Sequence, residues 1–155
     1  MKYKLADKNQ ISELVDIRIK YLKEDIGHIT EEEQRKMEEL LPPYFKRHLG
    51  LVFFPFIAQE GERIIASAFL LITEKPASPH FINGRTGMVL NVYTDKDYRR
   101  QGIAFRLMQM LTEHARQNGL DYIELKATQD GYPLYQKCGF SESTENYISM
   151  KYFLR

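Results

Sequence analysis

Residues 86–128 switch periodicity twice, and this pattern constrains the fold more than any other feature of the sequence. "TGMVLNVYT" at 86–94 and "YIELKAT" at 122–128 are rich in β-branched and apolar residues, which predicts strands. The segment at about 102–118 between them has apolar residues at helical spacing. A strand, a helix and a strand in this order predict two parallel strands joined by a right-handed crossover.

The residues before this unit predict one strand and two helices. "YKLA" at 3–6 is typical of a short strand, and apolar residues at near-helical spacing follow it. Thr30 and Glu33 have the spacing of a capping box, which predicts the start of the second helix. Pro42 and Pro43 fall inside that helix, and we expect them to break or kink it.

Further strands are expected in the middle and at the end of the chain. "LVFFPFIAQ" and "RIIASAFLLIT" flank "EGE" at 60–62, which predicts an antiparallel hairpin. A short helix at about 132–138 and a strand "YISMKYFL" at 147–154 complete the prediction. The order of elements indicates an α/β chain with helices on a mixed sheet, and 155 residues suit a single domain over 1–155.

Composition excludes several classes of protein. Lys plus Arg is 22 and Asp plus Glu is 21, so a nucleic-acid partner is not expected. A single cysteine and four histidines predict neither an internal disulfide nor a metal site. The N-terminus lacks the apolar core of a signal peptide, and no apolar run approaches the roughly 18 residues of a membrane span. We therefore expect a soluble cytoplasmic protein.

The stretch "YRRQGIAFRLMQML" at 98–111 places a glycine and positive charge at the start of the crossover helix. The first N–H groups of a helix lack partners, and the helix dipole adds partial positive charge there. Gly102 has no Cβ, so an anion can approach the chain closely, and Ala104 keeps the first turn small. Arg99 and Arg100 add charge that can attract a diphosphate.

Other phosphate-binding motifs do not fit this stretch. A P-loop requires Lys-Ser or Lys-Thr after its second glycine, and a Rossmann fingerprint requires three glycines near the start of the fold. A helix with a loose glycine start and solvated arginines remains the alternative interpretation.

The sequence "NVYTDKDYRRQGIAFRLM" together with "LYQKCGF" resembles the GNAT superfamily of acyl-CoA-dependent N-acetyltransferases. Residues 99–104 fit the family's Arg/Gln-x-x-Gly-x-Gly/Ala signature, and "PLYQKCGF" at 133–140 fits its second signature. The resemblance implies a GNAT-like mixed α+β fold, in which a mostly antiparallel sheet has helices on both faces and one parallel crossover at 86–128.

The resemblance also implies acetyl-CoA as the acetyl donor, with CoA as product. Backbone amides from Arg100 to Phe105 are expected to hold the diphosphate, and main-chain atoms of Val92 and Thr94 to pair with the pantetheine arm. Thr128 stands where many relatives have an asparagine that contacts the cofactor. The residues expected to bind the cofactor are Val92, Tyr93, Thr94, Arg99, Arg100, Gln101, Gly102, Ile103, Ala104, Phe105, Thr128 and Lys137.

The implied activity is N-acetylation of a primary amine by direct transfer. Tyr135 stands at the position of the family's general-acid tyrosine, with plain packing as its alternative role. Glu124 resembles a strand glutamate that serves as base in one subfamily; the alternatives are a solvated strand residue, or water as the proton acceptor. The other hypotheses are a non-catalytic acyl-CoA-binding or regulatory module and an unrelated nucleotide-binding domain.

The acceptor is expected to bind near the first two helices and the loops at 24–30 and 75–85. Glu24 and Asp25 are candidates for attracting a cationic amine, and solvated helix faces explain them equally well. A small metabolite, an antibiotic, a polyamine and a protein N-terminus all remain open. No nucleic-acid or membrane partner is expected, and a homodimer is possible.

Overall fold

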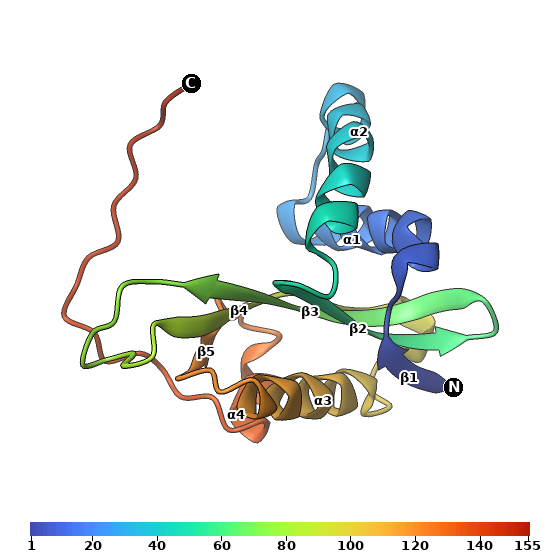
Figure 1. The fold of residues 1–155 in the computed structure, drawn as a ribbon. Helices are drawn as coiled ribbons and strands as arrows, with labels where there is room; N and C mark the ends of the chain where they lie inside the picture. The colour runs from blue at the N-terminus through green and yellow to red at the C-terminus, as the bar shows by residue number, and fades with distance from the viewer.

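A computed structural model describes residues 1–155 and has one five-stranded sheet with the strand order β1-β2-β3-β4-β5 (Figure 1). The first four strands pair antiparallel, and β4 and β5 pair parallel. The strands are β1 (Lys2–Leu5), β2 (Phe53–Glu60), β3 (Arg63–Glu74), β4 (Arg85–Thr94) and β5 (Ile123–Glu124). The predicted hairpin and the parallel crossover are therefore confirmed.

Helices cover both faces of this sheet (Figure 1). On one side lie α1 (Ile11–Ile26) and α2 (Glu31–His48), and on the other lie α3 (Ile103–Gln117) and α4 (Tyr132–Lys137). Two short 3-10 helices, η1 (Lys8–Gln10) and η2 (Lys96–Tyr98), precede α1 and α3. The predicted mixed fold with helices on both faces is confirmed. None of these helices combines the length and apolar character that a membrane span requires.

Two hydrophobic cores follow from the alternation of side chains along β2 and β3. Phe56 points to the α3 side, where it packs in a cluster with Leu107 and Leu111. Its neighbour Ile57 points to the opposite side and joins the cluster that contains Phe45. Neighbouring residues of a strand face opposite sides of the sheet. A strand that is buried on both faces therefore has a nearly continuous apolar sequence, as β3 has in "RIIASAFLLIT".

The helix α2 continues through Pro42 and Pro43, so of the expected break or kink the break does not occur. Beyond the prolines, Phe45 is 2% exposed and stacks on Phe53 with ring centroids 5.2 Å apart. Burial of this large aromatic side chain offsets part of the cost of two helix positions without a backbone N–H. The predicted capping box at Thr30 and Glu33 is present.

The predicted strand at 147–154 does not form, and β5 is shorter than the predicted 122–128. Residues 141–155 make no backbone–backbone hydrogen bond with the rest of the chain. A strand needs a neighbour to pair with, and this segment runs away from the sheet (Figure 1). The segment has the composition of a strand but has no partner strand within the chain.

Candidate active site

The start of α3 exposes a row of backbone donors. None of the N–H groups from Arg100 to Phe105 has an acceptor in the backbone of the chain. Arg100 and Gly102 both have left-handed backbone, with φ of 62° and 77°. A Cβ built on Gly102 would meet nothing within 4 Å, so glycine is favoured by the conformation and the space outside it is open. This geometry can bind an anion at the helix N-terminus.

The strands β4 and β5 pair at only two positions and then part. Gly87 pairs with Ile123 and Met88 with Glu124, and no residue of β4 after Met88 has a partner on that side. The edge of β4 from 89 to 94 therefore offers main-chain groups to a ligand. An extended ligand with amide groups can pair with such an edge as a strand would.

A bulge in β4 lies along this free edge. The pairing with β3 shifts between Ser67 and Phe69, and Asn91 has a φ of 55°. Left-handed backbone is tolerated by asparagine better than by most residues, and a bulge redirects the strand that contains it. The bulge therefore changes the direction of β4 next to the point where it separates from β5.

Buried side chains hold this bulge in place. The Ser67 hydroxyl donates to the backbone oxygen of Asn91 (2.8 Å) and accepts from Asn91 Nδ2 (3.1 Å). Arg18 Nη1 on α1 donates to Asn91 Oδ1 (3.2 Å), and burial lowers the pKa of the Arg18 guanidinium from its ordinary value. Asn91 and Ser67 are almost fully buried, so these bonds are shielded from competing water.

Tyr135 on α4 lies opposite the start of α3. Its ring packs edge-on against Phe140 with centroids 6.0 Å apart, and burial is the main cause that raises the pKa of its phenol to about 12. A Cβ on Gly131 would lie 2.9 Å from the ring, so the loop before α4 comes close to it. The Thr128 hydroxyl accepts from the N–H of Gly131 (3.1 Å) and holds that loop. The phenol therefore keeps its proton at neutral pH.

One cleft of about 710 Å³ brings most of the predicted site residues together. Four of the predicted residues do not line it: Gln101, Phe105, Lys137 and Glu124. The Lys137 ammonium lies over the Phe105 ring, 4.6 Å from its centroid, and Glu124 is exposed on β5. The predicted residues that do line the cleft are Val92, Tyr93, Thr94, Arg99, Arg100, Gly102, Ile103, Ala104, Thr128 and Tyr135.

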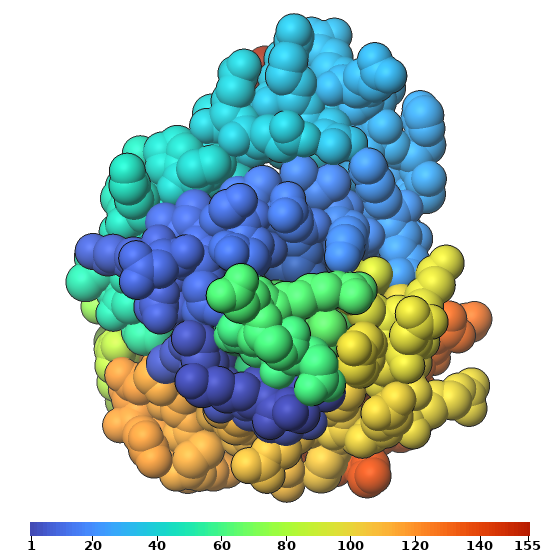
Figure 2. Space-filling view, turned by 90° about the vertical axis from the view of Figure 1, so that its right-hand side faces the viewer, coloured from blue at the N-terminus to red at the C-terminus, as the bar shows by residue number.

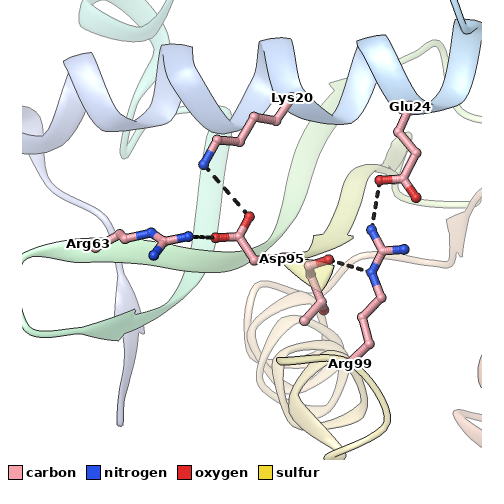
Figure 3. Close-up of polar contacts among 6 residues, drawn as sticks. Lys20, Glu24, Arg63, Asp95 and Arg99 are labelled. Atoms are coloured by element: carbon pink, nitrogen blue, oxygen red, sulfur yellow. Dashed lines mark hydrogen bonds and ion pairs between the residues drawn. The ribbon is translucent and has the colours of Figure 1, made fainter. Parts of the chain in front are cut away.

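Arg99 joins α1 to the turn between β4 and α3 (Figure 3). Its Nε donates to the backbone oxygen of Thr94 (2.8 Å), and its Nη2 donates to Glu24 Oε2 (2.7 Å). This hydrogen bond lowers the pKa of Glu24 and raises that of Arg99. Of the two predicted arginines, Arg99 is thus already paired with a carboxylate, and Arg100 has no ion pair.

A family model described as "Acetyltransferase (GNAT) family" matches residues 13–140. The chain belongs to the GNAT family of acetyltransferases. A glucosamine 6-phosphate N-acetyltransferase from Trypanosoma brucei brucei is 29% identical over 141 residues, which is 84% of this chain and 92% of the relative. A glucosamine 6-phosphate N-acetyltransferase 1 from Oryza sativa subsp. japonica is 33% identical over 118 residues, or 74% of this chain and 66% of the relative.

A solved structure from Clostridium acetobutylicum, described as a predicted acetyltransferase with acetyl-CoA, has the same fold. It superimposes with a TM-score of 0.84 at 30% identity, and the match covers 97% of this chain and 95% of the other. The predicted family resemblance and the enzyme class are both confirmed by these comparisons.

This GNAT acetyltransferase also has a buried carboxylate that the sequence analysis missed. Asp95 directly follows β4 and is 6% exposed, and its carboxylate pairs with Arg63 at 2.6 Å and with Lys20 at 3.8 Å (Figure 3). Its backbone N–H donates to Ile65 and its backbone oxygen accepts from Tyr98. Asp95 therefore fixes where the strand ends and the turn toward α3 begins. An aspartate directly after an apolar strand is the signal that could have found it.

Tyr21 on α1 lines the GNAT cleft and was also missed by the sequence analysis. It lies three and four residues before Glu24 and Asp25, so helical spacing puts all three side chains on one face, and all three line the cleft. Burial and the neighbouring Asp25 raise the pKa of its phenol. The space-filling view shows the surface of α1, in blue, next to the segment around residue 100, in yellow (Figure 2). Helix α1 thus forms the wall of the cleft opposite α3.

Proposed function

We propose that this enzyme transfers the acetyl group of acetyl-CoA to a small primary amine. A single observation carries the proposal: the free N–H groups at the start of α3, the unpaired edge of β4 and the phenol of Tyr135 all border one cleft. The anion site matches the diphosphate of acetyl-CoA, the free strand edge matches its pantetheine arm, and the proton donor matches its thioester.

The residues present fit the acetyl donor. The diphosphate would lie on the N–H groups from Arg100 to Phe105, with Arg100 as the nearby cation. The pantetheine amides would pair with main-chain atoms of Val92 and Thr94 on the free β4 edge. Lys137 contacts Phe105 outside the cleft, so we assign it no part in the main binding site.

The chemistry requires one bond to form and one to break. The amine nitrogen attacks the thioester carbonyl carbon, a C–N bond forms, the C–S bond breaks, and the sulfur leaves as a thiolate. Tyr135 supplies the proton that converts the thiolate to CoA thiol, and the phenol regains its proton from water. A positioned acid of this kind contributes typically about 10²–10⁴-fold. The raised pKa keeps the phenol in its donating form at neutral pH.

We propose that the attacking amine loses its proton to water. Glu124, the predicted base, is exposed on β5 and does not line the cleft. Glu24 lies in the cleft, and its Oε2 already accepts from Arg99. Asp25 and Asp130 are the cleft carboxylates without an ion pair in the structure, and we assign the binding of the acceptor ammonium to Asp25, which lies on the α1 wall.

Glucosamine 6-phosphate is the first acceptor to test, because it is named for two relatives. It carries an ammonium, for which the cleft has Asp25. A cytoplasmic enzyme would meet both this acceptor and acetyl-CoA.

The test follows CoA thiol release with a thiol-reactive dye, and mass spectrometry identifies the acetylated product. The panel contains glucosamine 6-phosphate, glucosamine, spermidine and a peptide with a free N-terminus; glucose 6-phosphate is the control without an amine. We expect amine-dependent thiol release with at least one small amine. CoA binding by calorimetry without acetylation of any amine would indicate a binding module and overturn the proposal, as would tight ATP binding with no CoA binding.

A further inference from the structure

The charges that line the cleft between α1 and α3 are only partly balanced within the chain. The lining contains three carboxylates, Glu24, Asp25 and Asp130, and two cations, Arg99 and Arg100. Glu24 and Arg99 form an ion pair of 2.7 Å and neutralise each other. Asp25, Asp130 and Arg100 take part in no ion pair. The cleft is therefore left with two free carboxylates and one free cation.

The two free carboxylates lie on the walls next to Tyr135, whereas the free cation belongs to the turn at the start of α3. Asp130 precedes Gly131, where a Cβ would lie 2.9 Å from the Tyr135 ring. Burial, followed by the nearby phenol of Tyr21, raises the pKa of Tyr135 to about 12. Asp25 follows Tyr21 by one helical turn and lies on the same face of α1. Both carboxylates therefore border the part of the cleft where the thioester and the amine would meet.

Other cations near α1 have partners of their own outside the cleft. Arg18 donates to Asn91 Oδ1 (3.2 Å), and Lys20 and Arg63 pair with Asp95 at 3.8 Å and 2.6 Å. No lysine lines the cleft. A phosphate on the acceptor would need arginine, lysine or free N–H groups, and those at the start of α3 are assigned to the acetyl donor. The acceptor side of the cleft therefore has no free group suited to a phosphate.

Bound acetyl-CoA would make the cleft still more negative. Its diphosphate carries more negative charge than Arg100 alone can balance, and it would lie in the same cleft as Asp25 and Asp130. Charges interact over a Debye length of ~8 Å at physiological ionic strength. A phosphate on the acceptor would therefore be repelled, and each further ammonium on the acceptor would be attracted.

Tyrosine rings on the walls of the cleft also suit a cationic acceptor. The rings that line it are those of Tyr21, Tyr93, Tyr98 and Tyr135. Tyr93 already has a cation over its ring, because the Arg99 guanidinium lies 5.6 Å from its centroid. The face of a phenol ring attracts ammonium groups, and its apolar surface packs against the methylene groups that join them. A methylene chain with an ammonium at each end is therefore complementary to this cleft of rings and carboxylates.

We propose that the acceptor is a small amine with at least two positive charges, a diamine or a polyamine, and that a phosphate on the acceptor weakens its binding. Asp25 holds the nitrogen that is acetylated until this nitrogen loses its proton to water. Asp130 binds a second ammonium of the same molecule. The inference rests on the proposed transfer to a small amine, and it adds the charge that this amine must carry.

The first experiment compares pairs of amines that differ in one charged group. Putrescine has a second ammonium that butylamine lacks, and glucosamine 6-phosphate has a phosphate that glucosamine lacks. We expect kcat/KM, measured by thiol release, to be about fivefold or more higher for putrescine than for butylamine, the factor of one charge pair in water. We expect it to be lower for glucosamine 6-phosphate than for glucosamine. Equal values within the first pair, or a preference for the phosphate in the second, overturns the proposal.

The second experiment removes the carboxylate assigned to the second ammonium. Asp130→Asn should lower kcat/KM for putrescine to near that for butylamine and leave the value for butylamine unchanged, whereas a structural role would slow both amines. Asp16→Asn is the matched control, because Asp16 is an exposed carboxylate of α1 that does not line the cleft, and it should keep the wild-type ratio. A wild-type ratio in Asp130→Asn overturns the assignment of the second ammonium.

Calorimetry separates this inference from the proposed function. Enzyme loaded with CoA is titrated with spermidine and, separately, with glucosamine 6-phosphate, and we expect tighter binding of spermidine. Tighter binding of spermidine without acetylation of any amine would contradict the proposed function and support the inferred charge of the ligand. Acetylation of glucosamine 6-phosphate in preference to every polyamine would support the proposed function and overturn the inference, as would spermidine that does not bind.

Discussion

Arg18 on α1 donates a hydrogen bond from Nη1 to Oδ1 of Asn91 on β4 (3.2 Å), although the two residues are 73 positions apart. The bond joins the helix that carries Tyr21 and Asp25 to the strand whose free edge borders the cleft. Asn91 is also fixed from β3 by Ser67. The buried side chain of Asn91 thus fixes the position of α1, on the acceptor side of the cleft, relative to β4, on the acetyl-CoA side.

This relationship predicts different results for two small substitutions at Asn91. In Asn91→Ala both hydrogen bonds are lost and the left-handed backbone becomes unfavourable, at a cost of about 1–2 kcal/mol for the backbone alone. Asn91→Gly loses the same bonds but keeps the backbone geometry. We expect the Tm of the alanine variant to fall below that of the glycine variant, and its kcat to fall by roughly tenfold or more, since misplaced reacting groups slow transfer.

Arg18→Ala tests whether the link to α1 positions the site or only adds stability. We expect kcat to fall several-fold with little change in the KM for acetyl-CoA, and Arg18→Lys to restore part of it because the ammonium can donate to the same oxygen. A loss of Tm with unchanged kcat would show a purely structural role for Arg18.

The local features of the site could be predicted from the sequence, whereas its long-range contacts could not. The glycine at the helix start, the crossover unit and the tyrosine on α4 are encoded within short stretches, and the structure brings them to one cleft. The partners of Asn91 come from α1 and β3, so no local pattern reveals them. Lys137 is close to the signature in sequence, but helix α4 turns it toward Phe105.

The C-terminal segment 141–155 shows a different limit of sequence-based prediction. Its alternation predicts a strand at 147–154, and the structure has an extended chain there without a neighbour. Alternation reports that a segment is suited to pairing, but it does not say which edge it pairs with or in which molecule.

Gly102→Ala is predicted to weaken acetyl-CoA binding by tenfold or more. The added methyl strains a residue with φ of 77° and occupies the open space where the diphosphate would approach. Gly119→Ala is the matched control, because Gly119 follows the other end of α3, has a φ of 69° and also faces open space. Both variants should lose similar stability in thermal unfolding, but calorimetry should show weaker CoA binding only for Gly102→Ala. Equal affinity of the two variants would contradict the assignment of the diphosphate to this turn.

Glu124→Gln is predicted to change kcat by less than about twofold, because the carboxylate is exposed and outside the cleft. Asp25→Asn removes a cleft carboxylate and should raise the KM of the amine acceptor without changing the KM of acetyl-CoA. Steady-state kinetics with each substrate varied in turn distinguishes these results. A fall of kcat by a hundredfold in Glu124→Gln would instead identify Glu124 as the base.

Tyr135 predicts a specific pH dependence for both activity and stability. An ordinary tyrosine has a pKa of 10.0, and burial raises that of Tyr135 to about 12, so the phenol should still donate its proton at pH 10. We expect kcat to show no alkaline decline from this group below pH 10.5, and Tyr135→Phe to lower kcat by about 10²–10⁴-fold over the whole range. The matched control is Tyr132→Phe on the same helix, which should leave kcat unchanged.

The stability change has the opposite direction to that of a salt-bridged carboxylate. The folded protein binds the phenolic proton more tightly than the unfolded chain does, so this stabilisation is complete below pH 10 and is lost as the pH rises from 10 to about 12. Chemical unfolding of the wild type should therefore lose more free energy in this window than unfolding of Tyr135→Phe, which has no such proton. Parallel curves for the two proteins would show that burial does not raise the pKa of this phenol.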